Sequence, residues 1–220
     1  MTASDLISEV PALSLDSSIE RALQWMDEFH VRHLPVVQEK TLIGIVSEHQ
    51  LFDAEGEFEH IEDIALADRF AFVKSDKHLY DVMQLMADNN LTTLPVLHAA
   101  EGYYMGLITL ETLFKHFSVT GAVSHSGAIL VLEMPARNFV LSEIARLLES
   151  ENTLILSAYV SSPPNSETLE LTLKLNRLDL GRAVATLERF GYVVKNVFDE
   201  TDYTDTLRDR YDLLMNYLNM

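Results

Sequence analysis

Apolar residues in the first half of the chain recur in an order that predicts a helix, two strands and a shorter helix. Spacings of three and four residues predict a helix whose apolar face holds Ile19, Ala22, Leu23, Met26 and Phe29 or His30. Ser17 and Glu20 fit a capping box at the start of that helix. Short apolar runs at residues 34–37 and 42–46 predict two buried strands joined by a tight turn. The shorter helix is expected over residues 48–54.

The same order returns in a second copy. Residues 14–37 and 74–97 superimpose without a gap, and residues 44–47 match residues 106–109 after two inserted residues. The second helix places Leu79, Val82, Met83 and Met86 on one face. Its strands and short helix are expected at residues 94–97, 103–108 and 110–117. A period this long predicts two copies of one supersecondary unit, stacked about a pseudo-twofold axis with clefts between them. Trp25, Met26 and Met86 lie on helical faces and are interpreted as core or dimer contacts.

The pattern changes after a small-residue linker at residues 121–127. Strands are expected at residues 128–134, 153–161, 168–175 and 192–198, and helices at residues 141–150 and 180–190. Residues 162–166 are interpreted as a hairpin connection. The order β-α-β-β-α-β is that of a ferredoxin-like domain, so the predicted class is α+β. Residues 200–220 follow as an amphipathic helix with Leu207, Tyr211, Leu214 and Leu218 on one face, which we expect to dock on this protein or on a second subunit.

Charge narrows the range of partners. Lys and Arg total 16 against 34 Asp and Glu, which gives a formal net charge of −18. Nucleic-acid backbones bind clustered cations, and the sequence has no basic stripe, so we expect no nucleic-acid partner. The same field weakly repels anionic membranes and polyphosphate ligands.

Composition narrows the class of protein. Hydrophobic residues make up 48% and charged residues 23%, as in globular proteins, and the absence of cysteine excludes disulfides, thiolate metal sites and cysteine nucleophiles. Acids stand near the start, where a signal peptide needs a basic region. No apolar run has the length of a membrane span. We therefore expect a cytoplasmic protein with no membrane contact.

The doubled Leu-Pro-Val, followed by a strand that ends in Gly-x-hydrophobic-Ser/Thr, resembles the motif of the CBS domain family. The second half resembles an ACT domain, and the layout is similar to that of bacterial CBS–CBS–ACT proteins, the acetoin-utilisation protein among them. The resemblance implies CBS repeats at residues 1–60 and 61–120 and an ACT-like domain at residues 128–199. It also implies a non-catalytic regulatory protein, a homodimer in which the CBS pair binds a small effector such as AMP, ATP or another adenosyl ligand.

The resemblance implies the residues of that site. Gly44 and Gly106 would let the backbone approach the ligand, while Ser47 and Thr109 would meet phosphate. His33 and its counterpart Thr93 would line the cleft wall. The family places an Asp three residues after the hydroxyl residue, where its carboxylate holds the ribose hydroxyls. Here Gln50 and Thr112 occupy those positions. Losing a charged hydrogen bond of about 1.5–3 kcal/mol would weaken ribose binding by roughly tenfold to a hundredfold.

The ACT-like half departs from its family too. Amino-acid-binding ACT domains often carry an Asp and a Gly between first strand and first helix, where this chain has Ala136 and Phe139. A large side chain at the Gly position would crowd a ligand. We therefore expect this domain to pair with another copy of itself or to close on the CBS pair.

Several features have simpler interpretations. Ser47 and Thr109 each precede a short helix and could serve as N-caps. The eight histidines show no metal-ligand spacing, and the acidic stretch 55–70 is interpreted as a solvated linker, not a cation site. No glycine-rich phosphate loop or GxSxG turn is present. The first hypothesis is thus a regulatory ligand sensor. The second is a ligand-free oligomerisation or interaction module with an unknown protein partner, and the third is an enzyme without a recognisable motif.

Overall fold

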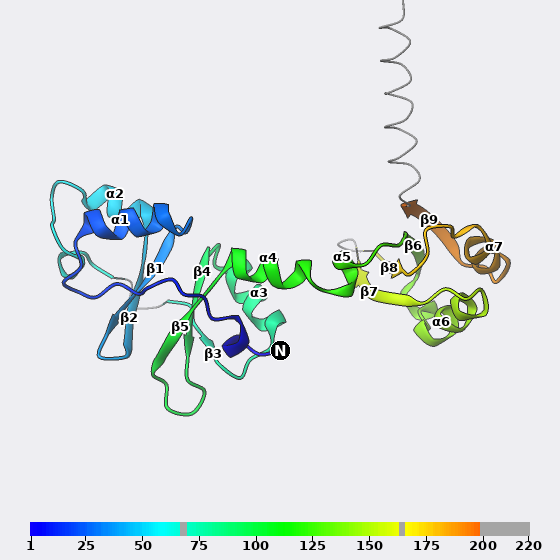
Figure 1. Ribbon diagram of the computed structural model, residues 1–220, viewed down its shortest axis with the longest axis horizontal. Coiled ribbons are helices and arrows are strands. Elements are labelled where there is room, and N and C mark those ends of the chain that lie inside the picture. The colour runs from blue at the N-terminus through cyan, green and yellow to red at the C-terminus, as the bar shows by residue number, and fades with distance from the viewer. Residues whose placement is uncertain (67–69, 163–165, 199–220) are drawn as a thin grey trace, which may run out of the picture. The chain divides into compact units, whose positions relative to one another are not determined.

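The computed structural model describes residues 1–66, 70–162 and 166–198. The chain forms two compact units, Met1–His116 and Phe117–Met220, each of which is described by itself (Figure 1). The first unit contains both repeats. In the second unit, helices pack against a four-stranded sheet. The predicted α+β class is confirmed.

The first repeat has the four predicted elements in the predicted order. They are α1 (Ile19–Glu28), β1 (His33–Gln38), β2 (Thr41–Ser47) and α2 (Glu48–Ala54). The second repeat comprises β3 (Val73–Lys74), α3 (Leu79–Asp88), β4 (Thr93–Leu97), β5 (Tyr104–Thr109) and α4 (Leu110–Ser118). The predicted duplication is therefore present as two copies of one helix–hairpin–helix unit.

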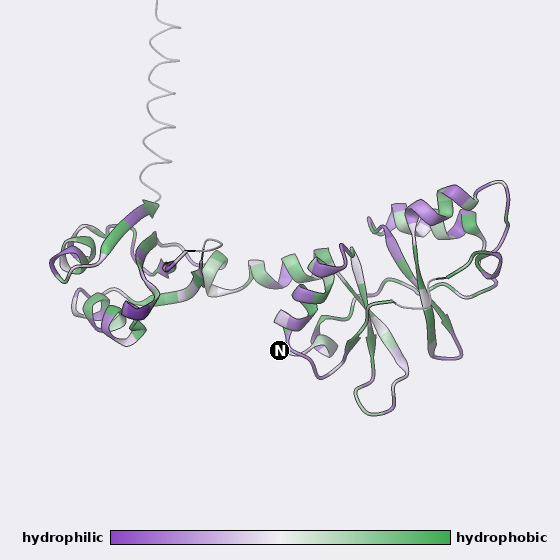
Figure 2. Cartoon of the chain, turned by 180° about the vertical axis from the view of Figure 1, so that it is seen from behind, coloured by the Kyte–Doolittle hydropathy of each residue, from purple (hydrophilic) through white to green (hydrophobic). Residues whose placement is uncertain are grey.

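The two hairpins share their register. In the first, Leu34 lies opposite Val46, and in the second Leu94 lies opposite Ile108. All four side chains are fully buried. A β-bulge recurs at the same place, between Val36 and Val37 in one hairpin and between Val96 and Leu97 in the other. The strands of the first unit are accordingly its most hydrophobic segments, whereas its helices carry a polar face (Figure 2).

The helices confirm most of the predicted apolar faces. Ile19, Ala22 and Met26 are buried on α1, and Leu79, Val82 and Met86 are buried on α3. Trp25 packs against the core, with the Arg21 guanidinium 4.5 Å from its ring centroid. The prediction for Met83 is wrong, because its side chain lies beside the buried stripe and is 39% exposed.

The predicted cap of the first helix is also wrong by one residue. Ser18, not Ser17, is the N-cap of α1, and its hydroxyl accepts a hydrogen bond from the Arg21 amide. The Ser17 hydroxyl instead accepts from the Ser14 amide at 3.0 Å. The Ile61 amide donates to the Ser17 carbonyl at 3.0 Å, and this long-range contact helps to fix where the chain turns into the helix.

Each repeat begins with a short 3-10 turn that pairs with the other repeat. The turn η1 (Ala3–Leu6) hydrogen-bonds to the second repeat, where the Ala3 amide donates to the Lys77 carbonyl at 2.8 Å. The turn η2 (Ile61–Asp63) hydrogen-bonds to the first repeat through the Ile61–Ser17 bond. The leading segments are thus exchanged between the repeats, and this exchange brings residues of each repeat to the strands of the other.

The second unit has the predicted β-α-β-β-α-β order after the short helix α5 (Gly121–Ser124). Its elements are β6 (Ile129–Pro135), η3 (Ala136–Asn138), α6 (Leu141–Ser150), β7 (Ile155–Ser161), β8 (Thr168–Leu175), α7 (Gly181–Arg189) and β9 (Val193–Phe198). The strand order is β7-β8-β6-β9, and every neighbouring pair is antiparallel. This is the ferredoxin-like arrangement.

One face of this sheet forms the core of the second unit. Alternate residues of β8, from Leu169 to Leu175, are buried against α6 and α7, as the predicted half-buried strand requires. Ala136 and Phe139 lie in and just after η3. The predicted hairpin connection at residues 162–166 and the predicted helix at 200–220 fall wholly or partly outside the described residues.

Candidate ligand-binding site at the junction of the repeats

The hairpins of the two repeats meet where β1 and β4 begin. Ser47 lies opposite His33 in the first ladder, and Thr109 lies opposite Thr93 in the second. Because β1 and β4 touch, four of the predicted site positions gather at one end of the junction. The duplicated sequence places them there as two equivalent pairs.

Thr93 and His33 are joined across the junction. The Thr93 side chain is fully buried, and its hydroxyl donates to the His33 backbone carbonyl at 2.8 Å. The adjacent Thr92, which sequence reasoning missed, also bridges the repeats. Its hydroxyl accepts from the Arg32 amide at 2.8 Å and lies 3.1 Å from Nδ1 of His33.

The surroundings of the His33 imidazole favour its neutral form. The Thr92 amide donates to its Nδ1 at 3.3 Å, so that nitrogen carries a lone pair. Burial lowers the pKa of His33, the Arg32 cation lowers it further, and the Glu48 carboxylate partly opposes both effects. Protonation would place a proton on Nδ1 facing the Thr92 amide, so the junction favours the neutral ring.

Ser47 and Gln50 bond to each other in a capping box at the start of α2. The Gln50 backbone amide donates to the Ser47 hydroxyl at 3.3 Å. The Ser47 backbone amide and hydroxyl each donate to the side-chain Oε1 of Gln50 at 2.9 Å. The N-cap interpretation of Ser47 is therefore confirmed. A ligand that used this hydroxyl would share it with the helix.

Thr109 and Thr112 form the equivalent pair at the start of α4. The Thr112 amide donates to the Thr109 hydroxyl at 3.0 Å, and the two hydroxyl oxygens lie 3.0 Å apart. The Thr109 side chain is buried and caps the helix, as its alternative interpretation predicted. Both positions that replace the family's Asp are thus engaged with the preceding hydroxyl residue.

The two glycines lie beneath side chains of the exchanged leading segments. A methyl group at position 44 would lie 3.2 Å from Cβ of Leu66. A methyl group at position 106 would lie 2.5 Å from Cγ2 of Ile7, and Gly106 has φ +153°. At each glycine, an apolar side chain lies close to the backbone, where the ligand was expected to approach.

Ile7 and Leu66 are site residues that the repeat comparison missed. A signal for them exists, because both leading segments contain an Asp followed by an aliphatic residue, at Asp5-Leu6 and at Asp63-Ile64. In each segment the Asp carboxylate accepts from the backbone amide three residues earlier. The segments nevertheless lie outside the stretch that superimposes without gaps.

The electrostatic environment of the junction is modest. Arg32 lies 3.9 Å from the Glu48 carboxylate, and the Arg32 side chain is 76% exposed. Exposed pairs of this kind contribute about 0–1 kcal/mol. Arg32 therefore remains accessible as a cation beside His33. Among the residues that the structure describes, no group of three or more acidic, histidine or cysteine side chains is placed to hold a metal ion.

Comparison with known families identifies the first unit. The CBS domain profile matches residues 3–57 and 61–119, which together make up just over half of the chain. The chain belongs to the CBS domain family. Within the described residues, no helix is both long enough and apolar enough to cross a membrane.

Two curated relatives match about half of the chain. Inosine-5'-monophosphate dehydrogenase of Methanocaldococcus jannaschii is 27% identical over 111 residues, which are 50% of this chain and 22% of that protein. Homoserine O-acetyltransferase of Methanocorpusculum labreanum is 32% identical over 116 residues, 51% of this chain and 23% of that protein. The chain spans less than a quarter of the length of these relatives.

Two solved structures are similar to about half of the chain. A CBS domain pair/ACT domain protein of Thermotoga maritima has a TM-score of 0.45 and 18% identity, and the match covers 53% of this chain and 96% of that chain. A CBS domain pair in complex with 5'-methylthioadenosine and S-adenosyl-L-methionine has a TM-score of 0.44 and 23% identity, with 54% and 96% covered. The family assignment rests on the profile match.

Proposed function

We propose that this chain is a non-catalytic regulatory protein whose CBS pair senses a small ligand of the adenine-nucleotide type. The ligand would bind where the two hairpins meet. The second unit would act as an ACT-like domain that supports a homodimer, in the layout of the bacterial CBS–CBS–ACT proteins. A cytoplasmic location is part of this proposal, whereas the domain limits drawn from the sequence stay predictions.

The observation that carries the proposal is the gathering of polar groups and apolar side chains at one junction. His33 and the capping hydroxyls of Ser47 and Thr109 lie at its polar end. Ile7 and Leu66 lie over the two glycines and offer apolar surface of the kind that packs against a purine face. An adenosine derivative combines these two chemistries.

The missing carboxylates determine the expected strength of binding. Gln50 and Thr112 stand where the family's Asp would hold the ribose, and both are bonded to the preceding cap. A neutral hydrogen bond is worth about 0.5–1.5 kcal/mol and a charged one about 1.5–3 kcal/mol. The proposed ligand would accordingly bind more weakly than it binds a CBS pair that keeps the Asp.

A thermal-shift panel tests the proposal. It would contain AMP, ATP, S-adenosylmethionine, 5'-methylthioadenosine, amino acids and divalent cations. A ligand present at about a hundred times its Kd stabilises the folded state by about 2.7 kcal/mol, which corresponds to a shift on the order of 5–10 °C. A shift with an adenosine derivative supports the proposal, and no shift with any of them contradicts its adenine form.

A second function is favoured by one specific observation. Ser47 bonds to Gln50, Thr109 bonds to Thr112, and aliphatic side chains cover both glycines. These groups of the junction therefore have partners within the protein without a ligand. A CBS pair of this kind would serve as an assembly or interaction module. This second function predicts that no compound of the panel shifts the melting temperature. It also predicts a complex with a partner protein whose affinity nucleotides do not change.

A further inference from the structure

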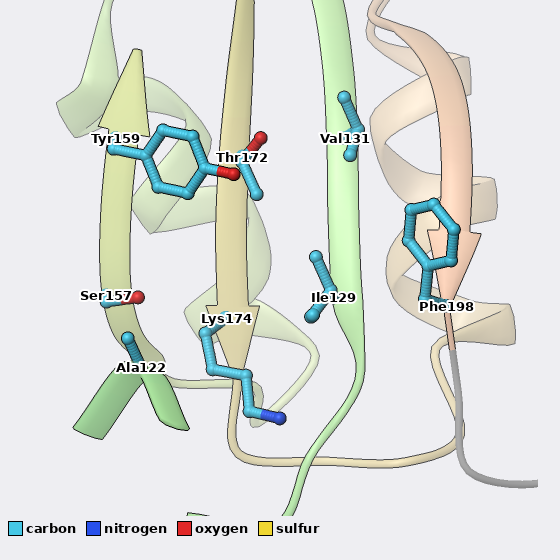
Figure 3. Close-up of a pocket in the computed structure, with 8 residues that line it drawn as sticks. All are labelled: Ala122, Ile129, Val131, Ser157, Tyr159, Thr172, Lys174 and Phe198. Atoms are coloured by element: carbon cyan, nitrogen blue, oxygen red, sulfur yellow. The ribbon is translucent and has the colours of Figure 1, made fainter. Parts of the chain in front are cut away.

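The sheet of the second unit has one face that α6 and α7 do not cover. Figure 3 shows this face, on which Tyr159, Thr172, Val131 and Phe198 project from four adjacent strands with the helices behind them. A groove of about 320 Å³ runs over it. Among the residues that the structure describes, Ala122 of α5 lines the groove from outside the sheet. We call this surface of the sheet the open face.

The centre of the open face is an apolar row that includes an exposed aromatic ring. Val131 lies opposite Thr172 in one ladder, and Thr172 lies opposite Tyr159 in the next, so the three residues form one row across the sheet. Tyr159 is 61% exposed, and Phe198 on β9 is 55% exposed. Large exposed aromatic side chains beside a groove indicate a surface that takes part in an interaction.

The two ends of the open face differ in charge. At one end Glu133 lies opposite Glu170, and the single Lys195 ammonium pairs with both carboxylates, which leaves this end acidic. At the other end Lys174 donates to the Gly127 carbonyl, a neutral acceptor that does not compensate the charge of the ammonium. The acidic end and the basic end are therefore complementary to each other.

The charged ends lie at equal distances from the apolar row. Glu170 and Lys174 stand on β8, two residues before and two residues after Thr172, and all three project from the same side of the strand. Consider a twofold axis that lies in the plane of an interface and crosses β8 at Thr172, perpendicular to the strands. It would place Lys174 of each copy over Glu170 of the other, and it would bring the two Tyr159 rings together.

We infer that the open face is a dimer interface, on which the open face of a second copy of this chain packs with its strands reversed. The inference rests on the homodimer of the proposed function and names the surface through which it forms. An interface between identical copies requires a surface that complements itself under a twofold rotation. The order Glu170, Thr172, Lys174 along β8 has this property. Two sheets packed in this way lie about 10 Å apart.

The size of the open face determines the expected strength of the dimer. Four strands about 4.8 Å apart and about 23 Å long give a face of roughly 450 Å² on each copy. The total of roughly 900 Å² is smaller than that of stable complexes, about 1,200–2,000 Å², and falls in the range of transient ones. We therefore expect a Kd on the order of 10 μM and a dimer that dissociates on dilution.

Charge reversal in the full chain tests this inference. Sedimentation velocity would be measured at protein concentrations below and above about 10 μM. Lys174→Glu sets like charges against each other at both contacts between the copies, and Glu170→Lys does the same with the opposite sign. The matched controls are Arg182→Glu and Glu188→Lys, which make the same charge changes at exposed positions of α7, behind the sheet.

Each single reversal should weaken dimerisation at least about tenfold, since repulsion replaces attraction at two symmetry-related contacts. An equimolar mixture of the Lys174→Glu and Glu170→Lys proteins should regain the dimer. In the mixed dimer the two reversed residues face each other, and so do the two original ones. The double variant should dimerise as the original chain does, and so should both α7 controls.

The possible failures are distinguishable. A dimer that neither reversal weakens would overturn the inference and leave the proposed homodimer in place. An original chain that stays monomeric at every concentration would contradict the homodimer and the inference together. Reversals that weaken the dimer without recovery in the mixture would also overturn the inference, because they would show damage to the fold and no contact between Lys174 and Glu170 of different copies.

Discussion

The Thr93 hydroxyl donates a 2.8 Å hydrogen bond to the backbone carbonyl of His33, which occupies the same position in the other repeat. Thr93 is fully buried, so water does not substitute for this bond. Equivalent residues of a duplicated sequence thus meet at the junction through different groups, a side chain from one copy and a backbone carbonyl from the other.

Replacing Thr93 by valine should destabilise the first unit. The change keeps the shape of the side chain but removes the donor and leaves a buried carbonyl without that partner, at a cost of about 1–3 kcal/mol. Urea unfolding measures the difference. Thr112→Val is the control, because it removes a partly buried hydroxyl within one repeat and should cost less. Equal losses for the two variants would contradict the role assigned to Thr93.

The two glycines should differ in their tolerance of alanine. Gly106→Ala combines a left-handed backbone with a methyl group 2.5 Å from Ile7, and together these should cost about 2–4 kcal/mol. Gly44→Ala meets Leu66 at 3.2 Å without an unfavourable φ, so its cost should be smaller. Denaturant midpoints compare the variants. A Gly44→Ala protein less stable than Gly106→Ala would show that the coverage of the glycines is misassigned.

Stability should fall in mild acid because of His33. Its pKa is lower in the folded protein than the ordinary value near 6.5, so below pH 6.5 the unfolded chain binds more protons. The His33 contribution is therefore complete above about pH 6.5 and is lost as the pH falls toward the folded-state pKa. Urea midpoints between pH 5 and 8 should show a smaller decline for His33→Asn. His49→Asn, an exposed change on α2, should keep the decline, because His33 is intact.

Gln50→Asp should leave the protein folded and nearly as stable as the original. An Asp in the third helical position already completes the capping boxes at Asp5, Asp63 and Asp81. The substitution should therefore change the free energy of unfolding by no more than about 0.5 kcal/mol. A loss above about 1 kcal/mol in urea unfolding would show that the longer glutamine side chain is required at this cap.

The duplicated half of the fold could be predicted because its signals are local and doubled. Leu34-Pro35-Val36 and Leu94-Pro95-Val96 form buried strands in both copies, as their apolar runs indicate. The N-cap of α1 could not be chosen locally, since Ser17 and Ser18 both have the required hydroxyl. The backbone amide of the distant Ile61 donates a hydrogen bond to the Ser17 carbonyl where the chain enters the helix. Local sequence patterns contain no information about such a long-range bond.

The candidate site was predicted only in part for a similar reason. Ser47 and Thr109 were found because they stand in register in both copies. Ile7 and Leu66 were missed because the exchange of the leading segments is a long-range feature, and a short 3-10 turn has too few residues to show a period. Thr92 was missed because its counterpart, Arg32, takes part through its backbone amide.

Calorimetric titration of AMP into the full chain and into Gln50→Asp tests the central claim most directly. The account predicts saturable binding to both proteins, with the Asp variant at least about tenfold tighter, because a charged acceptor for the ribose returns beside the Ser47 cap. Gln84→Asp, an exposed change on α3, should bind AMP as the original chain does. If neither the original chain nor Gln50→Asp binds at nucleotide concentrations on the order of 1 mM, the junction is not an adenine-nucleotide site and the account is contradicted.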